Sequence, residues 1–371
     1  MSLKEKSISA TFSAYLDLLR LAAAFFVLLF HIKKLAGPIE ITKFIPDHGH
    51  DAVILFFVLS GYVIAATADR KQDDGLRGYI LDRVARVYSV AIPALILSAL
   101  LALGFQSVLD PGNPYSLQQL TIDSSVNFFF IGQSWSLKNW VYFNQPYWSL
   151  CYEVMYYLGY GVFFFFKGWK KWIGILIVCL IAGPKVLLLL PCWALGVLTY
   201  HMRDKLPLQP RTALILAFLL PPLILVNLHV IGFGPMVRGL SFAILGDQKN
   251  YLEFSNDFLV DYVTAVLVAF NLYCARYVTL NIPNWIMLAA KKWAGISFTL
   301  YIMHLPLIYL IVNIAGVNRN SIGTLLIAAI GVPIICNFIA ELTEHKRPQL
   351  RQWLDQLFPR SQVKNPGLEQ Q

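Results

Sequence analysis

An arginine and a histidine, Arg20 and His31, stand in an otherwise apolar stretch near the start of the chain. Eleven residues of α-helix turn through about 1,100°, or three turns plus about 20°, so both side chains belong to one helical face, roughly 16 Å apart along the axis. Asp17 shares this face and is a candidate substrate contact. Ionisable groups inside apolar helices are costly and usually functional, and imidazole is suited to acid–base chemistry. The alternative is an Asp17–Arg20 ion pair within the helix and a histidine that is merely satisfied at the membrane interface.

A carboxylate, Glu153, lies in another apolar stretch, shortly after Trp148. A buried carboxylate needs a partner, and His31 is the nearest candidate if both lie at similar depth. Trp148 is a candidate substrate contact, although aromatic residues also form belts at membrane interfaces.

Three polar residues, Ser297, Tyr301 and His304, recur at i, i+4 and i+7 in a later apolar stretch, and therefore lie on one helical face. Tyr301 and His304 are candidate substrate contacts, and hydrogen bonding between helices is the alternative. Ser60 is a further candidate, in a Ser-Gly step after a run of large apolar residues. Such a small step also permits close helix packing.

A cluster of arginines, Arg77, Arg83 and Arg86, follows the second apolar stretch. Arg83 and Arg86 share a helical face at i, i+3, and guanidinium groups bind phosphate bidentately. The alternative is a positively charged anchor on the cytoplasmic side of a membrane.

The elements that position these residues follow from composition. Of the 371 residues, 57% are hydrophobic and only 14% are charged, whereas soluble domains carry about 25% charged residues. We therefore predict an all-α, polytopic transmembrane bundle. With about 20 apolar residues per crossing, the sequence predicts ten spans, near 14–34, 51–68, 88–108, 146–166, 172–183, 184–201, 211–230, 257–275, 295–315 and 321–341. The shorter apolar segment 120–131 is expected to be interfacial or re-entrant, and the five cysteines are expected to be buried and unpaired.

Charge gives the expected orientation. With the N-terminus inside, the cytoplasmic segments hold 21 of the 30 Lys and Arg residues, as the positive-inside tendency requires. The net charge of +9 is thereby explained without nucleic acid. We expect both termini in the cytoplasm of a bacterium, a transmembrane domain over residues 1–345 in the inner membrane, and a cytoplasmic tail over residues 346–371.

Five patterns occur in order along the chain, and together they resemble the membrane-bound acyltransferase-3 family. They are Arg20-x10-His31, Phe56-Phe57-x-x-Ser60-Gly61, Arg83-x-x-Arg86, Trp148-Ser149-Leu-x-x-Glu153 and Ser297-Phe-Thr-Leu-Tyr301-Ile-Met-His304. The resemblance covers residues 12–341 and implies a ten-helix fold. It also implies transfer of acetyl or other short acyl groups, usually from acyl-coenzyme A, to hydroxyls of surface glycans, antibiotics or lipid-linked sugars.

The resemblance implies that His31 is the catalytic histidine, that Arg20 is its companion, and that Arg83 and Arg86 serve the donor, with Arg77 nearby. The chemistry is consistent with this, since a neutral imidazole can activate an acceptor hydroxyl. Glu153 is expected to orient the ring, as the carboxylate does in a catalytic triad. Covalent and direct transfer both remain open.

The expected activity is O-acetyl transfer, or transfer of another short acyl group, to a polysaccharide or glycolipid of the cell envelope. No permanently bound cofactor and no metal is expected, and acetyl-CoA is the expected donor substrate. The expected partners are the acyl-CoA, the glycan acceptor and the bilayer, with a homodimer or polysaccharide-export proteins as further candidates and no nucleic acid. The alternative function is a transporter or flippase with a polar-lined path.

Overall fold

The structure is a computed structural model that describes residues 9–35, 42, 47, 49–109, 116–229, 232–280, 282–314 and 321–359. These residues form helices joined by turns, with no strand among them. The α-helices are α1 (Ala10–Leu35), α2 (Gly49–Arg70), α3 (Gly75–Leu109), α4 (Leu117–Phe128), α5 (Trp148–Phe165), α6 (Gly168–Leu188), α7 (Leu190–Met202), α8 (Pro210–His229), α9 (Phe233–Leu245), α10 (Lys249–Leu252), α11 (Phe258–Ala275), α12 (Asn284–Ala294), α13 (Ser297–Tyr309), α14 (Ile322–Leu342) and α15 (Arg347–Leu357). Short 3-10 segments are η2 (Gln72–Asp74), η3 (Gln145–Tyr147), η4 (Gly246–Gln248), η5 (Glu253–Ser255) and η7 (Glu344–Lys346), and η6 (Leu310–Ile314) is a π-helix.

The all-helical prediction is confirmed, but the number of spans is smaller than expected. Six helical segments of the described chain are long and apolar enough to cross a bilayer, and a seventh appears if α12 and α13, bent by 47°, count as one span. Helices do occupy the remaining expected spans. However, α7 has only 13 residues, or about 20 Å against a hydrocarbon core of about 30 Å. The tyrosines and Glu153 reduce the apolar character of α5, and the described apolar part of α8, Pro210–Ile224, is shorter than a crossing needs.

The break expected at Gly183-Pro184 is present, as a kink at which two helical pieces within α6 meet. Gly183 adopts φ +77, and the helix then continues to Leu188 before α7 begins at Leu190. Pro184 is tolerated because the first residue after a break needs no backbone donor. The expected break is thus confirmed, whereas the expected span 184–201 is divided at Leu189 between the end of α6 and α7.

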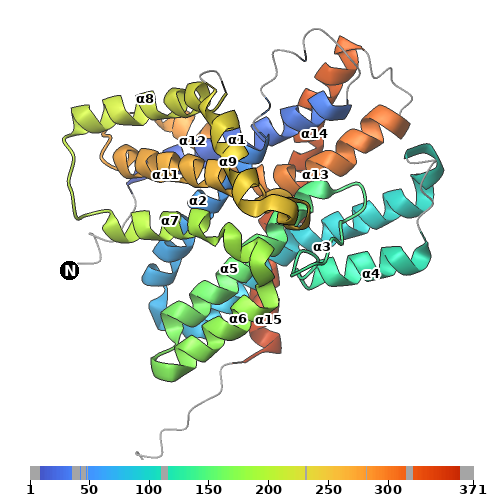
Figure 1. Ribbon diagram of the computed structural model, residues 1–371, viewed down its shortest axis with the longest axis horizontal. Helices are drawn as coiled ribbons and strands as arrows, with labels where there is room; N and C mark the ends of the chain where they lie inside the picture. Colours follow the sequence, from blue (N-terminus) through green and yellow to red (C-terminus); the bar gives the residue numbers. More distant parts are fainter. Residues whose placement is uncertain are drawn as a thin grey trace, which may run out of the picture.

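Helix α2 lies at the centre of the bundle, in contact with α1, α5, α7 and α11 (Figure 1). Its closest neighbour is α7. A Cβ added to Gly61 would lie 2.1 Å from the carbonyl oxygen of Trp193, and one added to Gly196 would lie 1.9 Å from that of Val58. The Ser-Gly step therefore does allow close packing, with Gly61 against α7.

Two peripheral segments lie against α3. Helix α4, within the segment expected to be interfacial or re-entrant, packs along α3 (Figure 1). Helix α15 also packs on α3, through ion pairs of Arg351 with Asp82 (3.0 Å) and of Arg77 with Asp355 (2.8 Å). The start of the expected tail is therefore a helix docked on the bundle, while residues 360–371 lie outside the described part. All five cysteines are unpaired, and all are buried except the half-buried Cys179.

Candidate active site

A cavity of about 60 Å³ lies among α1, α2, α3, α5 and α13. Three arginines line it, Arg20 from α1 and Arg83 and Arg86 from α3, and we call it the arginine cavity. Ser60 and Glu153 line it as well. The sequence-predicted arginine pair and the arginine of the first helix thus converge on one space.

The guanidinium groups of this cavity are only partly neutralised. Arg20 pairs with Asp17 at 3.3 Å, as the alternative for the first helix foresaw. Arg83 is 8% exposed, and its Nε has no hydrogen-bond partner among the described residues. Arg86 lies near Glu344 and Glu153 and over the ring of Phe298. Three buried arginines, one of them with a free Nε donor, suit an anionic, phosphate-bearing ligand.

Glu153 is held by hydroxyl groups in the arginine cavity. Ser60 Oγ donates to its Oε1 at 2.5 Å, and Tyr157 Oη donates to the same oxygen. Ser60 also accepts from Trp193 Nε1 at 3.3 Å. Since none of these groups is His31, the expectation that Glu153 orients the imidazole is wrong. Ser60 and Tyr157 provide the partner that a buried carboxylate requires.

A second cavity, of about 250 Å³, contains His31, and we call it the histidine cavity. Its wall includes His50, Trp148 and Asp257. The two cavities share two lining residues, Val53 and Tyr301. The rest of the polar or aromatic wall consists of Phe30, Lys34, Gln145, Glu253, Phe254 and Asn256.

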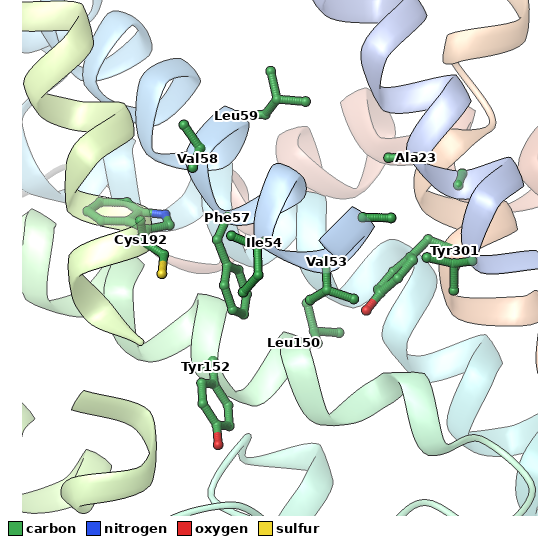
Figure 2. Close-up of a cluster of buried hydrophobic side chains, with 14 of the residues drawn as sticks. Ala23, Val53, Ile54, Phe57, Val58, Leu59, Leu150, Tyr152, Cys192 and Tyr301 are labelled. Carbon is green, nitrogen blue, oxygen red and sulfur yellow. The ribbon is translucent and has the colours of Figure 1, made fainter. Parts of the chain in front are cut away.

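Val53 and Tyr301 form the boundary between the two cavities, and Figure 2 shows them close together beside Leu150 of α5. The Tyr301 hydroxyl is 2.6 Å from Ser149 Oγ, and its ring packs on Phe56 at 5.0 Å between centroids. Tyr301 therefore makes the hydrogen bond between helices that was the alternative to substrate contact, in a position between the two cavities.

The partner of His31 is His304, which is fully buried on α13. His304 Nδ1 lies 2.8 Å from the carbonyl oxygen of Tyr301, so Nδ1 carries the proton and Nε2 is an acceptor. His31 Nδ1 lies 3.1 Å from that Nε2 and 3.0 Å from the carbonyl oxygen of Val27, so it donates. Both acceptors thus fix the proton of His31 on Nδ1, and its Nε2 keeps a lone pair for use as a base.

The remaining predicted residues lie outside this arrangement or have other contacts. Arg77 does not line either cavity, because Asp355 and the carbonyl oxygen of Phe358 bind its guanidinium. This corrects the expectation that it contacts the donor. Trp148 lines the histidine cavity, but its ring is stacked on Phe254 at 4.1 Å and is only 6% exposed.

Sequence reasoning missed several polar residues of the site. Tyr157 follows Glu153 at i+4, a spacing that identifies a neighbour on the same helical face. Asp261 is fully buried in α11, and its carboxylate lies 2.9 Å from His50. It is an ionisable residue in an apolar span, and the same criterion identified Arg20 as a candidate. Arg347, near Arg83 and Arg86, carried no such signal because it lies beyond the last apolar stretch.

Comparison with known proteins gives one match. A family model described as an acyltransferase domain, that of the acyltransferase-3 family, matches residues 13–340. Neither the curated proteins nor the solved structures include a chain that matches this one. The matched range spans most of the chain and contains every residue that lines the two cavities. The chain therefore belongs to the acyltransferase-3 family, as its ordered motifs indicated, and is a membrane acyltransferase.

Proposed function

We propose that the protein is an O-acyltransferase that moves an acetyl or other short acyl group from acyl-CoA to a hydroxyl of a cell-envelope or exported glycan. The observation that carries this proposal is the pair of adjoining cavities, one rich in arginine and the other containing a histidine with a free lone pair. Coenzyme A has its phosphates at one end and its thioester at the other. Two chemically different cavities that meet at Tyr301 and Val53 suit such a molecule.

The donor's phosphates bind Arg83 and Arg86 through charge-assisted hydrogen bonds. The pantetheine arm then extends past Tyr301, so that the thioester lies near His31. Arg20, on the same helical face as His31 and about 16 Å away along the axis, lies on the phosphate side. Glu153 stays with the arginines and limits their mutual repulsion.

The acceptor occupies the histidine cavity. His31 Nε2 takes the proton of the acceptor hydroxyl while the oxygen attacks the thioester carbon. The tetrahedral intermediate then collapses, its C–S bond breaks, and the coenzyme A thiolate leaves and takes the proton from His31. His304 accepts the Nδ1 hydrogen bond throughout and keeps the ring oriented. This is direct transfer, and no acyl-enzyme bond forms.

The arginine cavity faces the cytoplasm, where acyl-CoA is found, and both termini lie on that side. Arg83 and Arg86 follow a polar turn that the positive-inside tendency assigns to the cytoplasm. The histidine cavity then faces the opposite side of a bacterial inner membrane, where envelope glycans are modified.

The test uses the full chain in nanodiscs with radiolabelled acetyl-CoA and envelope glycans as acceptors. We expect the wild type to label the glycan, and His31→Ala to bind acetyl-CoA normally but lose transfer. His201→Ala is the matched control, because His201 lies at the end of α7 and lines neither cavity. Normal transfer by His31→Ala would refute the assignment of His31 as the catalytic base. Wild-type protein that neither binds nor uses acetyl-CoA would refute the assignment of acetyl-CoA as the donor.

A further inference from the structure

A second histidine in the histidine cavity, His50, is held by a buried carboxylate. His50 Nε2 lies 2.9 Å from Asp261 Oδ1, and Asp261 is completely buried. Neither oxygen of Asp261 accepts a hydrogen bond of good geometry from any residue that the structure describes. A buried carboxylate without a counter-ion is costly, so His50 is its counter-ion and is fixed in position.

The first turn of α2 brings His50 close to the helix of His31. A Cβ added to Gly49 would lie 2.5 Å from the ring of Phe30. The residues Gly49-His50 and Phe30-His31 are therefore neighbours across a contact that only glycine allows. Both histidines line the same cavity.

One edge of the His50 ring remains available to a ligand. As the counter-ion of Asp261, the imidazolium carries a proton on each nitrogen, and Nε2 lies beside the carboxylate at ion-pair distance without a hydrogen bond of good geometry. Within the described chain Nδ1–H has no acceptor, and the side chain is 32% exposed. The ring also stacks beside Trp148, with an angle of 11° between the planes, which limits its rotation.

The rest of the wall suits a ligand with many hydroxyl groups. Gln145 and Asn256 contribute amides, and Glu253 and Asp257 contribute carboxylates. Each hydroxyl both donates and accepts, so it needs partners of both kinds. The carboxylates already have cations, since Glu253 pairs with Lys185 (3.1 Å) and Asp257 with Arg238 (3.0 Å). They are thereby held in place as acceptors.

We propose that His50, positioned by Asp261, binds a carbohydrate acceptor by donating from Nδ1 to one of its oxygens, next to the hydroxyl that His31 activates. This inference rests on the proposed function, since it assumes that the acceptor occupies the histidine cavity. His50 takes no part in proton transfer; it is a binding residue that selects and orients the acceptor.

The experiment compares two amides that replace different ring nitrogens. In His50→Gln the amide nitrogen falls near the position of Nε2 and keeps the contact with Asp261. In His50→Asn it falls near that of Nδ1, and Asp261→Asn is added so that no carboxylate is left without a counter-ion. KM is measured separately for acetyl-CoA and for methyl glucopyranoside, methyl galactopyranoside and methyl mannopyranoside, in nanodiscs.

We expect His50→Gln to raise the KM for the glycoside about tenfold, as loss of a charge-assisted hydrogen bond predicts. The His50→Asn/Asp261→Asn protein should show a rise below about threefold, and the KM for acetyl-CoA should stay constant in both. His201→Gln, remote from the cavity, should match the wild type.

The inference would be overturned if His50→Asn/Asp261→Asn raised the KM for the glycoside more than His50→Gln does. It would also be overturned if the KM for the glycoside and the KM for acetyl-CoA rose equally. Either result would show that His50 only balances the charge of Asp261. Wild-type protein that turns over acetyl-CoA but acetylates none of the three glycosides would also overturn the inference, while leaving the donor site intact. Absence of any acetyl-CoA binding would instead refute the proposed function.

Discussion

Replacement of Arg83 by alanine tests the arginine cavity as the donor site. Arg83 is 8% exposed, and its Nε has no hydrogen-bond partner in the described part of the chain. The substitution therefore breaks no ion pair that the structure records at this side chain, and we expect only a small loss of stability. The free Nε donor is a group that a phosphate would satisfy.

The size of the effect follows from the hydrogen bonds at stake. A hydrogen bond to a charged group contributes roughly 1.5–3 kcal/mol, and about 1.4 kcal/mol corresponds to a factor of ten in affinity. Loss of one such bond should raise the Kd for acetyl-CoA about 10- to 100-fold. Arg83→Lys should recover only part of this, because an ammonium keeps the charge but loses the bidentate geometry.

The assay is calorimetric titration of detergent-solubilised protein with acetyl-CoA, accompanied by thermal unfolding of each variant. Arg77→Ala is the matched control. Arg77 lies in the same helix, but its guanidinium contacts Asp355 and the carbonyl oxygen of Phe358 and does not line the cavity. An unchanged Kd in Arg83→Ala, or an equal loss in Arg77→Ala, would refute the assignment of donor phosphates to this cavity.

Three further predictions concern the His31–His304 pair, the packing of α2 against α7 and the orientation of the chain in the membrane. His304→Phe should keep acetyl-CoA affinity but lower kcat by at least about tenfold, because His31 loses an acceptor that fixes its proton on Nδ1; unchanged kcat in a transfer assay would contradict this role. Gly61→Ala should lower Tm in a thermal unfolding assay, because the added Cβ would lie 2.1 Å from a backbone oxygen of α7, and wild-type Tm would contradict the packing. A cysteine at Lys170 should resist an impermeant thiol reagent added outside intact cells, and rapid labelling would contradict the proposed orientation.

The sequence predicted the chemistry of the arginine cavity better than that of the histidine cavity. Arg20, Arg83 and Arg86 are charges in or beside apolar helices, so their cost alone indicates a common function. Tyr301 and His304 were found by helical spacing, and they do face the site. These inferences required only the geometry of single helices.

The pairing of residues between helices was not predictable in the same way. Glu153 was matched to His31 by depth, but rotation of α5 directs the carboxylate to Ser60 on α2. The bond between His31 and His304 joins residues 273 positions apart. It depends on the packing of α13 against α1, which one sequence does not reveal.

The lengths of the membrane spans were predicted less well for a related reason. Hydropathy located the apolar segments, including α5, α7 and α8. It did not reveal that α6 continues through Pro184 and leaves α7 with 13 residues. A glycine and a proline in sequence predict a break, and the structure has this break as a kink at the non-helical Gly183.

We propose that donor and acceptor approach His31 from two cavities that meet at Tyr301. The most direct measurement is a cryo-EM structure of the full chain in nanodiscs with a non-hydrolysable ketone analogue of acetyl-CoA. We expect phosphate density at Arg83 and Arg86, with the ketone carbonyl beyond Tyr301 and near His31 Nε2. Phosphate density away from both arginines, or an arm that does not extend toward the histidine cavity, would contradict it.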